Sequence, residues 1–181
     1  MVLLDERLED IGRERPELSQ AVARWDTIPG IDRVAGWTLL AEVGHAMAQF
    51  PTAEQLASWA CLCPGNRESA GKRLGGKTRK GSPWLRRIAC QCAWAAARTK
   101  NTYLSAQFRR LAARRGIKRA ILAVAHSLVI IGYYLQKGQH NYEDLGGDYF
   151  DRIDSDGLKR YFVKRLEKLG HKVTLVPIKA A

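Results

Sequence analysis

The residues with the clearest chemical potential lie in one basic, glycine-rich stretch, Cys61–Ser82 (CLCPGNRESAGKRLGGKTRKGS). Its glycines permit positive φ angles and let a ligand approach the backbone closely. Its cationic side chains can bind phosphate, and only Glu68 opposes their charge. These cations are Arg67, Lys72, Arg73, Lys77, Arg79 and Lys80. The composition predicts a mobile polar loop that binds a phosphodiester backbone.

Ser69 lies in the middle of this stretch, between Arg67 and Lys72. A serine hydroxyl is a weak nucleophile unless a base, a lowered pKa or a metal activates it, and the developing charge of a phosphoryl transition state needs cations around it. The stretch supplies the cations but shows no base or metal. Two interpretations stay open: Ser69 is a nucleophile, or it serves a turn or a helix cap.

A third interpretation comes from the pattern G-x-x-x-x-G-K-[ST], which the chain matches from Gly71 to Thr78. A phosphate-binding loop of this kind needs a β-strand before it and a helix that begins at its Lys-Thr pair. No β-like apolar run precedes Gly71, and Gly81 and Pro83 would stop a helix begun at Lys77. Nucleotide hydrolysis is therefore the weakest of the three interpretations.

The charge of the chain is unevenly distributed. The net charge is +12 and the isoelectric point is about 9.9. Residues 60–119 contain 16 lysines or arginines and one acidic residue, whereas residues 1–59 carry a net charge of −5. A basic middle third between less charged flanks indicates a binding face for a polyanion. A basic, solvated surface without a partner is the alternative.

Two further groups of residues could bind metals. The cysteines form two C-x-C pairs, Cys61/Cys63 and Cys90/Cys92, and four thiolates can hold zinc. The spacing is unlike the usual C-x-x-C, and positions i and i+2 of a helix point to different faces, so buried thiols in a reducing compartment are the favoured interpretation. Five aspartates in the tail could bind Mg²⁺ or Ca²⁺, but their spacing favours turns and a helix cap. They are Asp144, Asp148, Asp151, Asp154 and Asp156.

The elements that must position these residues are mostly helices. Residues 2–24 carry an apolar stripe interrupted by Pro16, typical of the end of a coiled-coil arm, with no evident partner for the stripe in this chain. Residues 25–43 resemble a helix-hairpin-helix, whose Pro29-Gly30 turn would direct backbone N–H groups at one DNA phosphate. An ordinary corner between two helices is the alternative.

Helices are also expected after the arm and the turn. Ser82 and Pro83 are typical of an N-cap and a first helical position. The helix dipole disfavours the positive charges of Arg86 and Arg87 near this N-terminus, and a bound phosphate would offset that cost. The apolar face of this helix would hold Trp84, Leu85, Ile88, Ala89, Cys92, Ala93 and Ala96. Other helices are expected at residues 50–62, 103–115, 118–136 and 157–169, and KVTLVPI is expected to form either a short edge strand or an extended tail. The helix at 118–136 is expected to form the core, with His126 as a hydrogen-bonded core residue.

These elements predict a mainly α fold: a helical domain with a helix-hairpin-helix-like segment, a basic glycine-rich loop and a C-terminal helical appendage. We expect an arm at residues 1–24, a serine-bearing DNA-binding domain at 25–138 and a tail at 139–181. No membrane span and no signal peptide are indicated, so a cytoplasmic location is expected.

Several segments together resemble a known family. They are IPGIDRVAGWTLLAEVG, the stretch from CLCPGNRESAGK to AAAR, and the tail YEDLGGDYFDRID. They are similar to the C-terminal transposase domain of the IS110 (IS116, IS902) insertion-sequence family, which the Piv-type DNA invertases share. The most specific part is P-G-x-x-x-S-[AG]-G-K, seen here as Pro64–Lys72, followed by K-G-x-x-x-L-R at Lys80–Arg86.

The resemblance implies a DNA transposase or site-specific recombinase in which Ser69 is the nucleophile and forms a covalent 5′-phosphoserine link to DNA. It also implies a guide RNA, assembly as a homo-oligomer, and an N-terminal RuvC-like domain whose DEDD carboxylates bind Mg²⁺. Binding of DNA phosphates is assigned to Arg67, Lys72, Arg73, Lys77, Arg79, Lys80, Arg86, Arg87 and Gly30. No cofactor or metal is expected within this chain.

The chain departs from the family pattern in two respects. CLCPG replaces GLAPG, which puts Cys61 and Cys63 at small-residue positions and is expected to change packing only. No RuvC-like domain with its DEDD set precedes the arm, so we expect a C-terminal half that binds DNA but cuts it poorly alone, or needs that domain in trans. The alternative is a helical DNA- or RNA-binding module without chemistry.

Overall fold

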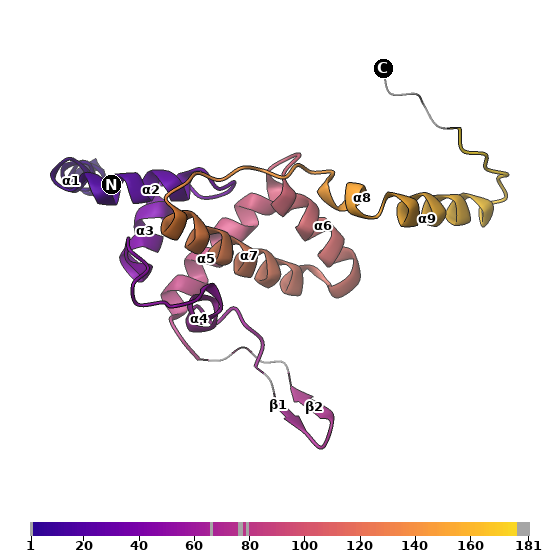
Figure 1. Ribbon diagram of the computed structural model, residues 1–181, viewed down its shortest axis with the longest axis horizontal. Coiled ribbons are helices and arrows are strands. Elements are labelled where there is room, and N and C mark those ends of the chain that lie inside the picture. The colour runs from indigo at the N-terminus through magenta and orange to yellow at the C-terminus, as the bar shows by residue number, and fades with distance from the viewer. Residues whose placement is uncertain (1, 66, 76–77, 79, 177–181) are drawn as a thin grey trace. The chain divides into compact units, whose positions relative to one another are not determined.

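A computed structural model describes residues 2–65, 67–75, 78 and 80–176 (Figure 1). Helices dominate it, which confirms the predicted mainly α class. The elements in chain order are α1 (Val2–Glu14), α2 (Pro16–Asp26), α3 (Arg33–Val43), α4 (Ala53–Trp59), β1 (Arg67–Ser69), β2 (Lys72–Gly75), α5 (Pro83–Arg98), α6 (Tyr103–Arg115), α7 (Ile117–Gly138), α8 (Tyr149–Ile153) and α9 (Ser155–Glu167).

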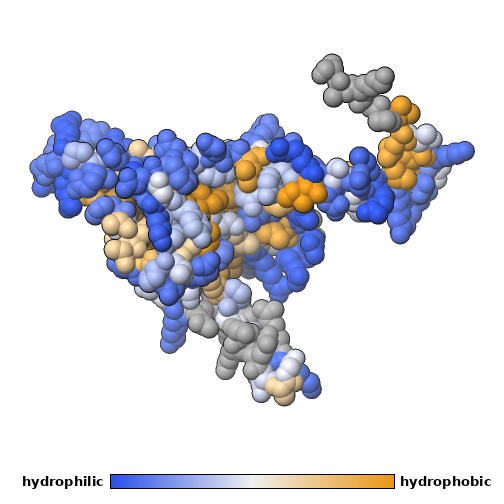
Figure 2. Space-filling model, in the orientation of Figure 1, coloured by the Kyte–Doolittle hydropathy of each residue, from blue (hydrophilic) through white to orange (hydrophobic). Residues whose placement is uncertain are grey.

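Helix α7 is the centre of the core, as its apolar sequence predicts. It packs against α5 and α6 and also contacts α4 and α2. Val124, Leu128 and Tyr133 are almost fully buried along it. The helix is long and apolar enough to cross a membrane by length and composition alone, but more than half of its apolar window is buried among these neighbours. Packing in the core therefore accounts for its hydrophobic sequence. Around the core, the face in Figure 2 is largely hydrophilic.

Helix α5 lies against this core and carries the end of the basic stretch. Ser82 caps it: its Oγ accepts a hydrogen bond from the Leu85 backbone N–H at 3.1 Å and donates one to Glu42 at 2.9 Å. Pro83 occupies the first helical position, as expected. Small residues on the buried side, Ala89 and Ala93 among them, let α5 approach α7 closely.

The apolar stripe of the first two helices has a partner within the chain, contrary to expectation. Val22 on α2 packs with Trp37 and Leu40 on α3 in a second hydrophobic cluster, and Leu8 on α1 lies against it. The expectation is wrong because the sequence does not show that the helix after the Pro29-Gly30 turn packs against the helix before it. Here α3 turns back onto α2 and covers it.

Helix α2 is also fixed directly to α7. The buried Gln136 donates from Nε2 to the Ala21 carbonyl at 2.7 Å and accepts from Arg24 Nε at 3.0 Å. The expected boundary after residue 24 falls inside α2, and contacts divide the chain instead into residues 1–147 and 148–181.

The segment from α7 to residue 147 also belongs to the first unit. Its Tyr142 backbone N–H donates to Thr27 Oγ1 at 3.0 Å, and Asp144 accepts from the Tyr103 backbone N–H at 3.0 Å. Asp144 and Asp154 thus serve a turn and a cap, as predicted: Asp144 also accepts from the Gly146 N–H, and Asp154 accepts from the Gly157 N–H at the start of α9. The described residues bring together no group of three or more His, Cys, Asp or Glu that could hold a metal.

The second unit holds α8 and α9, and neither helix buries a residue within the described part of the tail. Residues 171–176 have no regular structure, which agrees with the extended tail rather than the edge strand for this part of KVTLVPI. A single short apolar run has no partner strand there with which to pair. The rest of KVTLVPI lies outside the described residues.

The basic stretch forms a β-hairpin, which corrects the expectation of a simple loop. Strands β1 and β2 pair antiparallel, with Ser69 opposite Lys72 and Glu68 opposite Arg73. Ala70 and Gly71 form the two-residue turn with φ of 49° and 72°. Positive φ at both turn residues is typical of the tight turns that suit the twist of hairpin strands.

Candidate functional site

The hairpin presents Ser69 at its tip. Pro64 and Thr78 form an isolated β-bridge at its base, and the strands extend from there away from the helices (Figure 1). Ser69 is the last residue of β1 and is exposed, and so is Lys72, the first residue of β2. Residues directly opposite each other in an antiparallel pair place their side chains on the same face, about 5 Å apart at Cβ. The structure therefore sets one lysine beside the candidate nucleophile.

The other predicted cations of the stretch are placed only in part. The backbone of Arg67 belongs to β1 and that of Arg73 belongs to β2, so one arginine precedes Ser69 in the chain and the other follows it. Lys80 is exposed just before α5. Lys77 and Arg79 lie outside the described residues, so their predicted role stays a prediction.

Arg86 and Arg87 on the first turns of α5 have different settings. Arg86 donates from Nη1 to Thr78 Oγ1 at 2.8 Å, so it ties the base of the hairpin to the helix. Arg87 is exposed and its guanidinium lies 4.9 Å from the ring centre of Trp84. Trp84 is 61% exposed, which corrects its expected place on the apolar face of α5. That face starts at the neighbouring position, Leu85.

Gly30 is placed apart from the hairpin. Its φ is +88°, and a Cβ atom there would lie 2.3 Å from the backbone nitrogen of Ala96 and 2.6 Å from the carbonyl oxygen of Cys92. Close packing on the later turns of α5 therefore explains this glycine without a phosphate. The start of α3 is already capped by Asp32, which accepts from the Ala35 N–H at 2.7 Å and would repel an anion. A phosphate-binding role for this turn stays a prediction.

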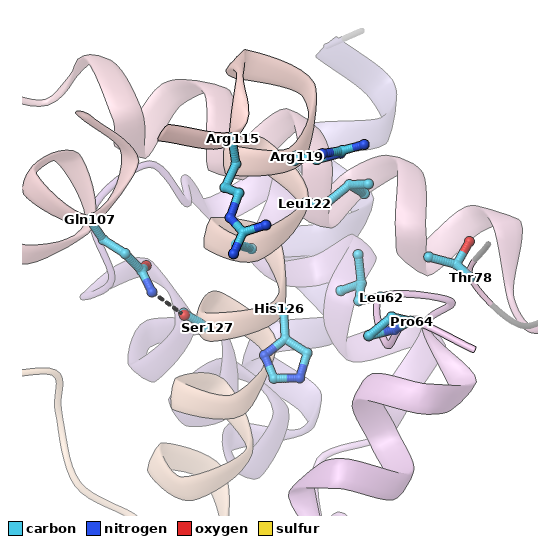
Figure 3. A pocket seen from close by; sticks show the side chains of 10 residues that line it. Leu62, Pro64, Thr78, Gln107, Arg115, Arg119, Leu122, His126 and Ser127 are labelled. Atoms are coloured by element: carbon cyan, nitrogen blue, oxygen red, sulfur yellow. Dashed lines mark hydrogen bonds between the residues drawn. The ribbon is translucent and has the colours of Figure 1, made fainter. Parts of the chain in front are cut away.

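A cavity of about 670 Å³ opens beside the base of the hairpin (Figure 3). One side is formed by Leu62 and Pro64 with Thr78, and the other by residues of α6 and α7. Those residues are Gln107, Arg115, Arg119, Leu122, Ala123, His126 and Ser127. The two arginines are exposed, so the cavity has a cationic rim around an apolar floor.

His126 lines this cavity rather than the core, which corrects its expected setting. Its ring is half-buried, and burial lowers its pKa below the usual 6.5 although Glu54 opposes the shift. Next to it, Gln107 donates from Nε2 to Ser127 Oγ at 2.8 Å, and its buried Oε1 has no hydrogen-bond partner in the described part of the chain. The wall of the cavity thus offers a neutral imidazole and an amide at physiological pH.

Two alternative chemistries find no support in this geometry. Gly71 is the hairpin turn and the next helix begins at Pro83, so the Gly71–Thr78 pattern lacks the strand–loop–helix context that a phosphate-binding loop needs. Burial raises the pKa of Cys92 to about 12, with Asp32 adding to the shift, and burial also raises the pKa of Cys90. Both thiols are therefore protonated at neutral pH, with Cys92 buried and Cys90 half-buried, and the described residues place no group of three or more potential metal ligands around them.

Comparison with known families gives one finding. The family model described as transposase IS116/IS110/IS902 family matches residues 22–109. The match begins in α2, includes the hairpin with Ser69 and all of α5, and ends in α6. Residues 22–109 therefore belong to the IS116/IS110/IS902 transposase family. No curated protein matches the chain.

Membership of a transposase family implies a role in DNA transposition, with DNA as the substrate. The transposase region contains the residues predicted to bind phosphate, from Gly30 to Arg87. It excludes α7, which supplies His126 and Arg119 to the cavity. The cavity wall thus combines the transposase region with the core helix that follows it.

The sequence alone does not predict this cavity. Arg115 and Arg119 both lie within the basic middle third of the chain, residues 60–119, so the sequence shows their charge, but their spacing does not assign either of them to a site. These two arginines and Thr78 line one cavity because of how α6 and α7 pack against the base of the hairpin. No spacing within one helix could show it.

Proposed function

We propose that this chain is the serine-bearing part of a DNA transposase and that Ser69 attacks a DNA phosphodiester. The observation that carries the proposal is the exposed place of Ser69 at the tip of a hairpin, opposite Lys72, within the region that matches the transposase family. An exposed tip can enter a groove or meet a distorted strand, whereas a structural serine of a cap or core could not.

The proposed step forms a bond from Ser69 Oγ to phosphorus and breaks the bond from phosphorus to the 3′ oxygen. The serine hydroxyl loses one proton and the departing 3′ oxygen gains one, so the products are a 5′-phosphoserine link and a free 3′ hydroxyl. Attack by another 3′ hydroxyl on the phosphoserine reverses these bond changes, restores Ser69 and completes strand exchange.

The cations near Ser69 have the role of stabilising the phosphate. Lys72 lies opposite the hydroxyl, and the backbones of Arg67 and Arg73 bring two arginines onto the same hairpin. Cations aimed at the equatorial oxygens of a phosphoryl transition state lower its energy. Lys80, Arg86 and Arg87 follow at the start of α5 and would bind the flanking backbone, and the cavity rim adds Arg115 and Arg119.

Activation of Ser69 is the part of the proposal that other components supply. We expect Mg²⁺ to be held by a RuvC-like domain, as the resemblance to the family implies. A guide RNA and assembly as a homo-oligomer are further partners that the resemblance implies, in the cytoplasm. The rival to this proposal is a nucleic-acid-binding module that uses the same basic face without chemistry.

A covalent-adduct assay tests the proposal. The protein and Mg²⁺ are mixed with nicked or bulged DNA that carries one end of the insertion sequence. The reaction is run with and without a separately expressed RuvC-like domain. Denaturing gels then show protein-linked DNA, which Ser69→Ala abolishes while DNA binding stays unchanged. A matched control is Ser127→Ala, which removes a hydroxyl outside the hairpin. If the wild type and Ser69→Ala bind DNA equally well and neither forms an adduct under any condition, the chain is the non-catalytic binding module.

A further inference from the structure

One face of α5 combines exposed tryptophans with arginines. Trp84, Arg87, Gln91, Trp94 and Arg98 follow each other at intervals of three and four residues, and all five are exposed. Such intervals place residues on one side of a helix. The opposite side is buried, with Leu85 and Ala96 among its core residues. We call these five residues the tryptophan–arginine face.

The exposure of the two tryptophans is unusual for their type. Trp84 is 61% exposed and Trp94 is 42% exposed. Large apolar side chains gathered on an exposed surface mark binding sites more often than isolated ones do. Each indole also has a guanidinium beside it: Arg87 lies 4.9 Å from the ring centre of Trp84, and Arg98 lies 6.0 Å from that of Trp94.

We propose that the tryptophan–arginine face binds single-stranded nucleic acid by stacking unpaired bases on Trp84 and Trp94. Aromatic side chains that alternate with cations are the usual platform for single strands, because rings stack on bases and cations bind the phosphates between them. A duplex hides its base faces within its own stack, so a row of indoles on a straight helix suits unpaired nucleotides. This proposal does not depend on the chemistry of Ser69.

The charge of the surroundings favours nucleic acid over a protein partner. Aromatic residues and arginines are also frequent in protein interfaces, so the ring pattern alone decides nothing. Neither α5 nor α6 contains a single aspartate or glutamate, and residues 60–119 hold 16 cations against Glu68. A surface of this charge attracts a polyanion and repels a second copy of itself.

The spacing of the two rings sets the length of strand that the face can hold. Ten residues separate Trp84 from Trp94, which corresponds to about 15 Å at about 1.5 Å per residue. A stacked strand advances about 3.4 Å per nucleotide, so the two rings are about four to five nucleotides apart. A strand must be longer than this to contact both rings at once.

The experiment uses the full chain and fluorescently labelled oligothymidine, dT12, with dT3 and a 12-base-pair duplex as comparison probes. Anisotropy titrations at several salt concentrations compare the wild type with Trp84→Ala, Trp94→Ala and the double variant. We expect each alanine to weaken dT12 binding about fivefold or more, with a small effect on the duplex. The preference for dT12 over dT3 should become smaller in the double variant, because only the additional phosphates of dT12 then favour it.

Matched variants separate stacking from charge and from folding. Trp84→Tyr and Trp94→Tyr keep an aromatic ring and should retain most of the affinity. Arg98→Gln should reduce the magnitude of the negative slope of log dT12 affinity against log salt by about 0.7, whereas the tryptophan variants should leave this slope unchanged. Tyr134→Ala removes an exposed aromatic side chain of α7 and should have no effect.

Unchanged dT12 binding in the double alanine variant would overturn the proposal. Sedimentation velocity tests the rival, in which this face is an interface between copies of the chain. The rival predicts that the wild type self-associates, that the tryptophan variants are monomeric and that dT12 affinity is unaltered. Neither outcome would affect Ser69 adducts, and loss of those adducts in Ser69→Ala would not alter dT12 binding. The two proposals therefore fail separately.

Discussion

The contact between α2 and α7 can be tested by adding one methyl group. Gly132 on α7 lies under the indole of Trp25, which is 1% exposed. A Cβ atom at Gly132 would lie 1.9 Å from both the Cη2 and Cζ3 atoms of that ring. Carbon atoms normally stay about 3.5 Å apart or more, so Gly132→Ala forces the buried indole, or α2 itself, to move.

Two opposing effects set the size of the loss. Alanine favours a helix interior over glycine by about 1 kcal/mol. Overpacking a core costs about 1–3 kcal/mol and sometimes more, and a clash with two ring atoms of a buried tryptophan belongs at the upper end. The net loss in free energy of unfolding should be about 2 kcal/mol, which lowers the melting temperature by about 4–8 °C in a chain of this size.

Thermal or urea unfolding of a double-mutant cycle measures this contact. Trp25→Phe removes the ring carbons that clash, so the double variant should be more stable than the sum of the single losses by about 1 kcal/mol or more. Gly12→Ala is the matched control, because its new methyl group would meet neighbours at 3.6 Å, an ordinary contact. That variant should be neutral or slightly stabilised.

A wild-type melting temperature for Gly132→Ala, or additive losses in the cycle, would refute this packing. The burial of Trp25 against α7 would then need another description, and the attachment of α2 to α7 would depend on the hydrogen bonds of Gln136.

Three further predictions concern the site. Arg115→Gln should lower the slope of log DNA affinity against log salt by about one, measured by anisotropy between about 50 and 200 mM, and an unchanged slope would exclude Arg115 from the phosphate contacts. The pKa of His126 is lower in the folded chain, so the unfolded chain binds the proton more tightly and the free energy of unfolding should fall as pH drops below about 6.5. Chemical denaturation at several pH values should show a smaller fall in this range for His126→Gln. Ser82→Ala removes a helix cap and a hydrogen bond to Glu42 and should cost about 1–3 kcal/mol in urea unfolding, whereas Ser82→Asn, which can still cap, should cost less.

The helices could be predicted because their signals are local. Ser82 and Pro83 begin α5 as their types indicate, and Gly116 ends α6 where the expected helix ends. The apolar period of α7 is enough to identify it as the core helix. Each of these signals depends on neighbours within one or two turns, which a single sequence displays.

The hairpin and the cavity could not be predicted, for two different reasons. The strands of the hairpin are short and polar, so they lack the alternation that indicates a strand, and Ala70-Gly71 is a less distinctive turn than Asn-Gly. The place of His126 depends on the packing of α7 against α6 and the hairpin base. Resemblance to the family singles out Ser69, but the pairing of Ser69 with Lys72 follows only from the strand register.

Mapping the covalent adduct by mass spectrometry tests the central claim most directly. Trypsin cleaves after Arg67 and Lys72, which releases the peptide Glu68–Lys72 (ESAGK), and Ser69 is its only hydroxyl side chain. After nuclease treatment of the protein–DNA adduct, we predict a nucleotide joined through its 5′ phosphate to this peptide. Attachment to any other peptide, with ESAGK unmodified, would contradict the assignment of Ser69 as the nucleophile.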